Sequence, residues 1–148
     1  MDFITGLHES NGYNAILGVV DRLTKMAYYI PTRKDTNSEK VACLYFDNIF
    51  HLHALPDSII SDRGTLFILA FFRTLCKLVG ISQNLSTSLY PQTDGQTERV
   101  NAILEHYLLG YINYQQNNWH ELLTMAEFSY NNTISATTGI TPFFAQYV

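Results

Sequence analysis

Three carboxylates stand where predicted secondary-structure elements end or begin, at Asp2, Asp62 and Glu98. Asp2 lies in a short strand, Asp62 follows the buried-strand pattern SIIS, and Glu98 starts an amphipathic helix. Because ligands of open α/β sheets collect outside the carboxyl ends of parallel strands, we expect the three side chains to converge there. The 35 residues numbered 63–97 separate Asp62 from Glu98.

Carboxylates that converge in this way predict metal-dependent chemistry. Like charges at contact distance cannot all stay ionised unless cations neutralise them. Two Mg²⁺ or Mn²⁺ ions held by oxygen ligands solve this problem and support phosphoryl transfer. One ion activates an attacking hydroxyl, and the other stabilises the leaving oxygen of an in-line displacement. The pattern is therefore typical of a metal-dependent nuclease or transferase.

Taken singly, each acid also has a structural explanation. Asp62 precedes Arg63 and Gly64 and suits a turn, while Glu98 at a helix start is stabilised by the helix dipole. Asp21 follows a strand and is expected to serve its turn. Acids inside predicted helices are expected to be solvated or to cap a helix; they are Asp47, Glu105, Glu121 and Glu127.

Composition limits the classes of protein. The net charge is −4, from nine basic and thirteen acidic residues, which argues against a chain that grips nucleic acid by bulk electrostatics. Cys43 and Cys76 have no zinc-ligand spacing and are expected to be buried free thiols. The N-terminus has no basic leader, and no apolar run approaches the ~18 residues of a membrane span. We therefore expect a soluble, intracellular protein.

Hydrophobic periodicity and turn residues predict the elements that must position the acids. Strand patterns cover residues 2–5, 15–21 and 24–31, and Asn11 with Gly12 is a strong hairpin-turn signal. The links between these strands are short. We therefore expect an antiparallel meander of three strands.

Strands and helices alternate in the rest of the chain. Ser38 is expected to cap a first helix that ends before Pro56, and Gly80 to stop a second helix over residues 70–79. Two more strands and two more helices are expected at residues 58–61, 81–86, 100–111 and 118–130. This order predicts one α/β domain over residues 1–148, with a mixed five-stranded sheet, helices on both faces and a ribonuclease-H-like outline.

Six stretches carry a family resemblance: MDFITGL, VVDRLTKMAYYIP, SDRG, YPQTDGQTERVN, WHELLTMAEFSYNN and TTGITPF. In this order, over essentially all 148 residues, they resemble the integrase catalytic core of gypsy-type long-terminal-repeat retrotransposons, within the retroviral integrase superfamily. The resemblance implies that Asp2, Asp62 and Glu98 are the family's Asp, Asp, 35-residue, Glu signature. They would then be both catalytic residues and metal ligands.

The resemblance also implies a function. It implies a DNA integrase, a polynucleotidyl transferase that processes retroelement DNA ends and joins them to target DNA with two Mg²⁺ or Mn²⁺ ions. Its partners would be DNA and, in the full-length protein, further copies of itself, without a membrane; it would act in the nucleus and also in cytoplasmic particles. DNA contacts are expected at Arg63, Gln92, Gln96, Arg99 and Asn101, although surface solvation accounts for each equally well.

The chain departs from the family's pattern without losing a metal ligand. SDRGTLF stands where SDRGPQF is common, HALP where HGLP is common, and Tyr90 where a His is usual. Such drift is typical of an old genomic copy, so ancestry is clearer than activity. Because the chain begins one residue before Asp2, we expect a truncated first strand and the loss of the family's zinc-binding and C-terminal DNA-binding regions.

Two other functions stay open. A ribonuclease H on the same fold needs an acid on its first helix, where the chain has Glu39 and Asp47. Neither lies in a recognisable context, and the 35-residue spacing has no role there. A domesticated or degenerate core would instead bind nucleic acid or protein without catalysis, and the retained carboxylates argue only mildly against it.

Overall fold

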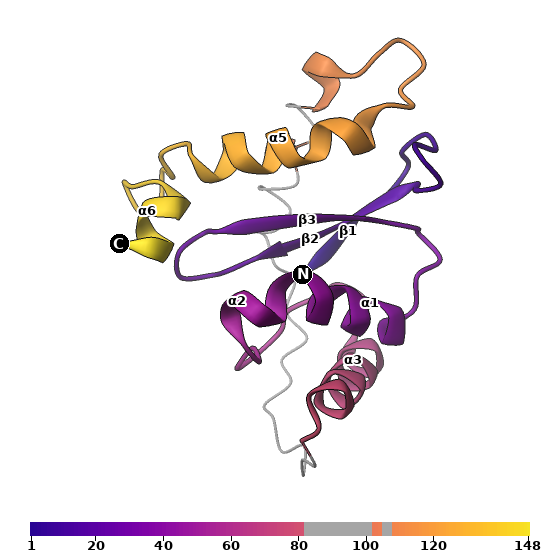
Figure 1. The fold of residues 1–148 in the computed structure, drawn as a ribbon, viewed down its shortest axis with the longest axis vertical. Coiled ribbons are helices and arrows are strands. Elements are labelled where there is room, and N and C mark those ends of the chain that lie inside the picture. Colours follow the sequence, from indigo (N-terminus) through magenta and orange to yellow (C-terminus); the bar gives the residue numbers. More distant parts are fainter. Residues whose placement is uncertain (82–101, 105–107) are drawn as a thin grey trace. The chain divides into compact units, whose positions relative to one another are not determined.

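The computed structural model describes residues 1–81, 102–104 and 108–148 of the chain (Figure 1). The chain forms two compact units. The first contains Met1–Lys34 and Gly95–Val148, and the second contains Asp35–Asp94. Each unit has its own set of buried apolar side chains.

An antiparallel sheet is the frame of the first unit. Its strands, in the order β1-β2-β3, are β1 (Asp2–Ile4), β2 (Ala15–Val20) and β3 (Ala27–Thr32). The register pairs Ile4 with Ile16 and Leu17 with Ile30. The predicted three-stranded meander is confirmed.

A two-residue hairpin turn lies between β1 and β2, where the sequence predicts it. Ser10 and Tyr13 bond to each other's backbone, with N–O distances of 2.8 and 3.0 Å. Asn11 and Gly12 between them take φ values of 53° and 83°. Such a turn requires positive φ at both central residues, and Asn and Gly adopt it at the lowest cost.

Asp21 builds the turn between β2 and β3, as predicted. Its carboxylate accepts hydrogen bonds from the backbone N and the hydroxyl of Thr24, at 2.9 and 2.6 Å. Its backbone N donates to the Met26 carbonyl at 2.8 Å and closes the turn. β3 begins at Ala27 rather than at Thr24, because Thr24 belongs to the turn.

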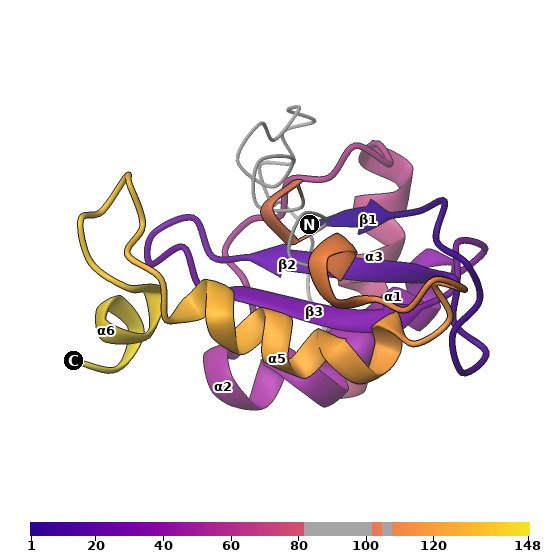
Figure 2. The same cartoon turned by 90° about the horizontal axis from the view of Figure 1, so that it is seen from above.

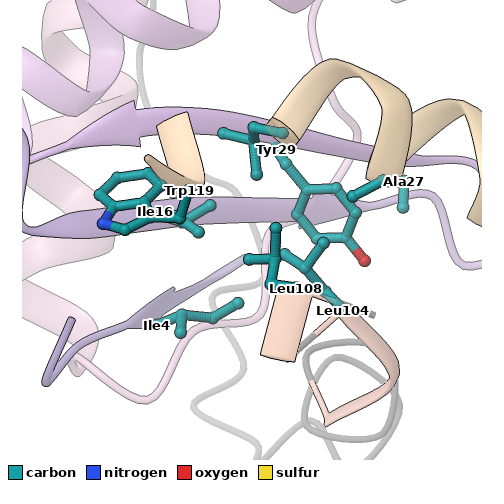
Figure 3. Packing of buried hydrophobic residues seen from close by; sticks show 9 residues of the cluster. Ile4, Ile16, Ala27, Tyr29, Leu104, Leu108 and Trp119 are labelled. Carbon is teal, nitrogen blue, oxygen red and sulfur yellow. The ribbon is translucent and has the colours of Figure 1, made fainter. Parts of the chain in front are cut away.

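Helix α5 (Trp119–Asn131) runs along β3 and closes the core of the first unit (Figure 2). Most of the core side chains are shown in Figure 3; the cluster comprises Ile4, Ile16, Ala27, Tyr29, Leu104, Leu108, Trp119, Leu123 and Ala126. The Trp119 indole N donates to the His8 carbonyl at 2.7 Å, which ties the start of α5 to the sheet's first hairpin. A short helix, α6 (Pro142–Tyr147), follows with Thr141 as its N-cap.

The second unit is helical over most of its described residues. Its elements are α1 (Ser38–Tyr45), the π-helical segment η1 (Phe46–Phe50), α2 (His51–His53) and α3 (Thr65–Val79). α1 packs on α3, where the rings of Tyr45 and Phe71 meet edge to face with centroids 5.6 Å apart. Asn37, and not Ser38, caps α1, since its side chain accepts from the Lys40 backbone N at 2.9 Å. No helix in the described part of the chain is long and apolar enough to cross a membrane.

Helix α3 ends as predicted but begins earlier. Gly80 takes φ 79° and bonds back to the last turn, which is a common helix stop. The helix starts at Thr65 rather than at Ala70, directly after Gly64. Ile68 is fully buried, so the apolar face already begins in the first turn.

The predicted sheet of five strands is not shown. Residues 58–61 contain the buried Ile59 and Ile60 but form no strand, so this prediction is wrong. A short apolar run indicates burial, whereas a strand also needs a hydrogen-bonded neighbour. Of the predicted strand 81–86, Ile81 is described and is not part of a strand; residues 82–86 lie outside the described residues.

Candidate active site

Asp2 is the first residue of β1 and is half-buried. The sheet register places it opposite Gly18 of β2. Its carboxylate accepts a hydrogen bond from the Phe3 backbone N at 2.9 Å. Asp2 therefore stands on a paired strand, and regular elements hold a site residue more precisely than loops do.

Asp62 is exposed and directly follows the buried residues 59–61. The turn that follows is built by its neighbours. The Arg63 backbone N donates to the Ser61 hydroxyl at 3.4 Å, and Gly64 takes φ 87° before α3 begins. The backbone thus changes direction at a glycine, and the Asp62 side chain stays in solvent.

Arg63, a predicted DNA contact, interacts with Thr36 and Phe67 within the second unit. Its Nη1 donates to the Thr36 carbonyl at 3.4 Å. Its guanidinium also lies over the Phe67 ring, 5.5 Å from the centroid. The side chain is exposed, so these weak contacts leave part of it open to solvent.

The remaining predicted site residues lie outside the described residues; they are Glu98, Gln92, Gln96, Arg99 and Asn101. Asp2 belongs to the first unit and Asp62 to the second. Within residues 1–81, 102–104 and 108–148, no group of three or more His, Cys, Asp or Glu side chains is placed to hold a metal ion. The described residues include two of the three predicted ligands, Asp2 and Asp62.

The acids that a ribonuclease H would need on the first helix are both at the surface. Glu39 lies in the first turn of α1, where it suits the helix dipole. Asp47 lies in η1 and is exposed. Neither has surroundings that indicate a catalytic role.

Glu127 was expected to be solvated or to cap a helix, and this prediction is wrong. Its carboxylate is partly buried and accepts a hydrogen bond from the Tyr29 backbone N in β3, at 2.7 Å. Burial raises the pKa of Glu127, and the hydrogen bond from Tyr29 partly opposes this shift. The sequence does hold a signal, because Glu127 lies four residues after the buried Leu123 and so on the apolar side of α5.

Comparison with known proteins finds relatives in sequence among transposon polyproteins. No family model matches it. The Tf2-3 and Tf2-4 transposon polyproteins of Schizosaccharomyces pombe (strain 972) are each 36% identical to it over 143 residues, or 97% of this chain. The chain spans 11% of the length of these polyproteins.

Solved structures with a similar fold include retroviral integrase catalytic cores. The HTLV-2 integrase catalytic core domain in complex with magnesium, in its trimeric form, matches with a TM-score of 0.67 at 18% identity, covering 99% of this chain and 94% of that one. The BIV integrase core matches with a TM-score of 0.60 at 21% identity, over 98% and 92% of the two chains. A chain of the simian T-cell lymphotropic virus intasome, in complex with PP2A regulatory subunit B56 gamma, matches with a TM-score of 0.70 at 18% identity, over 99% of this chain and 53% of that one.

At these identities the solved structures show the fold alone, which is the ribonuclease-H-like α/β fold of integrase cores. The transposon polyproteins are similar to the chain in sequence over nearly its whole length. The sequence relatives and the shared fold together support the integrase catalytic core that the motifs indicated.

Proposed function

We propose that this chain is the catalytic core of a DNA integrase, a polynucleotidyl transferase that processes retroelement DNA ends and joins them to target DNA. Asp2, Asp62 and Glu98 supply the carboxylates of its active site. Sequence similarity to transposon polyproteins over 97% of the chain supports this function. The position of Asp62 is the single structural observation behind the assignment of the site.

The surroundings of Asp62 support its proposed role as a metal ligand. A buried segment leads to it, and α3 begins three residues later, so ordered backbone supports it on both sides. The turn depends on Ser61 and Gly64, which leaves the carboxylate oxygens available to a ligand. A carboxylate that the fold does not need for itself is the kind of group that a metal site uses.

The proposed ligand set suits Mg²⁺. Carboxylate oxygens are the hard donors that Mg²⁺ and Mn²⁺ bind, and one similar solved structure is an integrase core in complex with magnesium. Two such ions would activate an attacking hydroxyl and stabilise the leaving oxygen of the cleaved strand. The chain's own contribution is orientation: strand pairing holds Asp2, and the turn before α3 holds Asp62.

DNA is the proposed substrate. Nine basic residues against thirteen acidic ones offer few phosphate contacts, so we expect this core to bind DNA weakly by itself. Arg63 is the proposed contact within the described residues, and Gln92, Gln96, Arg99 and Asn101 are proposed outside them. We further propose that the full-length protein is a homo-oligomer that acts on host DNA in the nucleus and also occurs in cytoplasmic particles.

Metal titration tests the site directly. We expect the Asp62→Asn chain to bind Mn²⁺ at least about tenfold more weakly than the wild type in calorimetry, since one charged ligand is lost. Asp57→Asn is the matched control, because Asp57 is exposed in the same segment and removes the same charge. Wild-type affinity in Asp62→Asn, or an equal loss in the control, would remove Asp62 from the site.

A core without catalysis is the second candidate, and one observation favours it. Ala54 takes φ 60° and ψ −150°, a conformation that is strained for any residue but glycine, at the position where the family pattern has Gly. Backbone strain that no further substitution has relieved is typical of a sequence that has accumulated mutations without selection for activity. Strand transfer by a longer chain, carrying the regions that flank this core in its relatives, distinguishes the two: a degenerate core would fold without joining DNA ends.

A further inference from the structure

The strand β3 has an open edge in the described sheet, since β2 is the strand it pairs with. In an antiparallel pair, alternate residues direct their backbone groups toward the neighbouring strand. The carbonyls of Met26 and Thr32 accept from Asp21 and Asn14 on the β2 side. The outward positions of β3 are therefore the odd-numbered ones.

Asn131 of α5 occupies the first outward position. Its side-chain oxygen accepts from the Ala27 backbone N at 2.9 Å, and its side-chain nitrogen donates to the Ala27 carbonyl at 2.8 Å. This pair of bonds is the one that a residue of a neighbouring strand would make. Asn131 is 1% exposed, so the amide does not exchange these partners for water.

The next two outward positions are also closed. The Tyr29 backbone N donates to the Glu127 carboxylate at 2.7 Å. Pro31 has no backbone N–H to offer, and proline in a sheet is typical of an edge that must not be extended. Every outward N–H of β3 is therefore either bonded to α5 or absent.

The spacing of the helix matches the spacing of the strand. Four residues of an α-helix rise about 6 Å, and two residues of a strand advance about 6.7 Å. Side chains four apart on α5 can therefore reach backbone groups two apart on β3, as Glu127 and Asn131 do. α5 runs antiparallel to β3 at this contact, since residue 131 meets residue 27 and residue 127 meets residue 29.

We propose that Glu127, Asn131 and Pro31 form an edge lock, which prevents β3 from pairing with β3 of a second copy of this chain. The strand AYYIPT carries no charge and is rich in residues that favour strands, so it resembles segments that self-associate when exposed. A strand pairs with a second copy of itself by the same outward groups that α5 now bonds. The lock is an autoinhibitory contact within the first unit, and it is independent of the proposed catalysis.

Paired substitutions on α5 test the lock. Glu127→Leu with Asn131→Leu removes both acceptors while keeping side chains of similar size. Glu121→Leu with Thr124→Leu is the matched control, because it adds two leucines to exposed positions of the same helix. Sedimentation over a range of concentrations, with amide exchange at Ala27 and Tyr29, gives the readout.

The lock predicts concentration-dependent association in the first double variant and wild-type sedimentation in the control. Glu127→Gln retains the acceptor and should sediment as the wild type does, whereas Glu127→Leu should speed exchange of the Tyr29 amide about tenfold. A folded lock variant that associates no more than the control would overturn the proposal. If that variant does not fold, amide exchange in the wild type is the test. Exchange of the Ala27 and Tyr29 amides as slow as that of Tyr28 and Ile30 would support the lock, and fast exchange would refute it.

Discussion

Two turns of this chain share the pattern Asp-Arg-x-Thr, DRLT from Asp21 and DRGT from Asp62, and use their aspartates in opposite ways. Asp21 follows strand β2, and Asp62 follows the buried residues 59–61. The Asp21 carboxylate accepts from the Thr24 hydroxyl and backbone N, at 2.6 and 2.9 Å, and so builds its turn. The Asp62 carboxylate is exposed, and its chain turns at Gly64 with φ 87°.

The third residue of the pattern explains the difference. Gly64 adopts a positive φ without cost, so the chain can enter α3 at Thr65 without help from the aspartate. Leu23 stands at the equivalent place in the first turn, where the carboxylate organises the backbone instead. A carboxylate whose lone pairs are bound by its own turn is a poor metal ligand. The glycine at the third position therefore explains why Asp62 is available to a ligand, whereas Asp21 is a structural part of its turn.

The largest expected effect is on activity, from Asp62→Asn. We expect metal-dependent strand transfer by the longer chain to fall at least about 100-fold. Mutating a residue that only hydrogen-bonds to a metal ligand can already lower activity by up to about 100-fold, and removing the ligand itself should lower it at least as much. The free energy of unfolding should change by less than about 0.5 kcal/mol, since the side chain is exposed. Chemical denaturation and a strand-transfer assay measure the two quantities. Retained turnover, or a large loss of stability, would make Asp62 a structural residue like Asp21.

Gly64→Ala should lower the free energy of unfolding by about 1–3 kcal/mol, the cost of a side chain in this backbone region. No heavy atom within 4 Å would meet the added Cβ, so the cost is conformational rather than steric. The reverse change, Ala54→Gly, is the matched control, because Ala54 has a similar conformation, and it should gain stability. Denaturation of both variants checks the sign; an unchanged Gly64→Ala would show that the turn does not depend on glycine.

Asp21→Ala should cost about 1–2 kcal/mol of stability, the range for hydrogen bonds to a partly buried charged group. Catalysis in the longer chain should fall only as far as folding does. Glu9→Ala, an exposed acid in the same unit, serves as the control and should change the free energy of unfolding by less than about 0.5 kcal/mol. A stable Asp21→Ala variant would mean that the turn forms without its carboxylate, and the contrast with Asp62 would weaken.

Glu127 shows a third use of a carboxylate, which is to accept a hydrogen bond from the edge of a strand. Its substitution gives the smallest expected effect. Its pKa is raised by burial, so the folded state disfavours the ionised form. The loss of stability from ionising Glu127 in the folded state is absent below the ordinary Glu pKa of 4.5. It grows as the pH rises toward the raised pKa of the folded state and is complete above that pKa. Glu127→Gln keeps the acceptor for Tyr29 and should raise the melting temperature near pH 7 but not near pH 4. A gain of equal size at both pH values would contradict this explanation.

Much of the fold could be predicted from the sequence because it depends on local conformation. Asn11 with Gly12 and the Asp21 turn give the meander, and Gly80 gives the end of α3. These residues act through their own φ values or through neighbours a few positions away. One error is also local: the helix cap is Asn37 rather than Ser38, since either side chain suits the role and only geometry selects one.

The strand predicted at residues 58–61 shows that a hydrophobic pattern alone is not sufficient to predict a strand. Ile59 and Ile60 are buried as an apolar run requires, yet they form no strand. Burial follows from the free energy of removing apolar surface from water, which does not depend on backbone pairing. Whether a buried segment becomes a strand depends on a second segment, which its own sequence does not specify.

The sequence by itself indicated the family and the three candidate carboxylates, and it determined the turns of the first sheet. Tertiary structure alone decided how two polar residues of α5 are used. Glu127 bonds to a residue 98 positions away, and Asn131 to one 104 positions away. The physical reason is that β2 satisfies only one side of β3, and the groups left over are known only once the strands have paired.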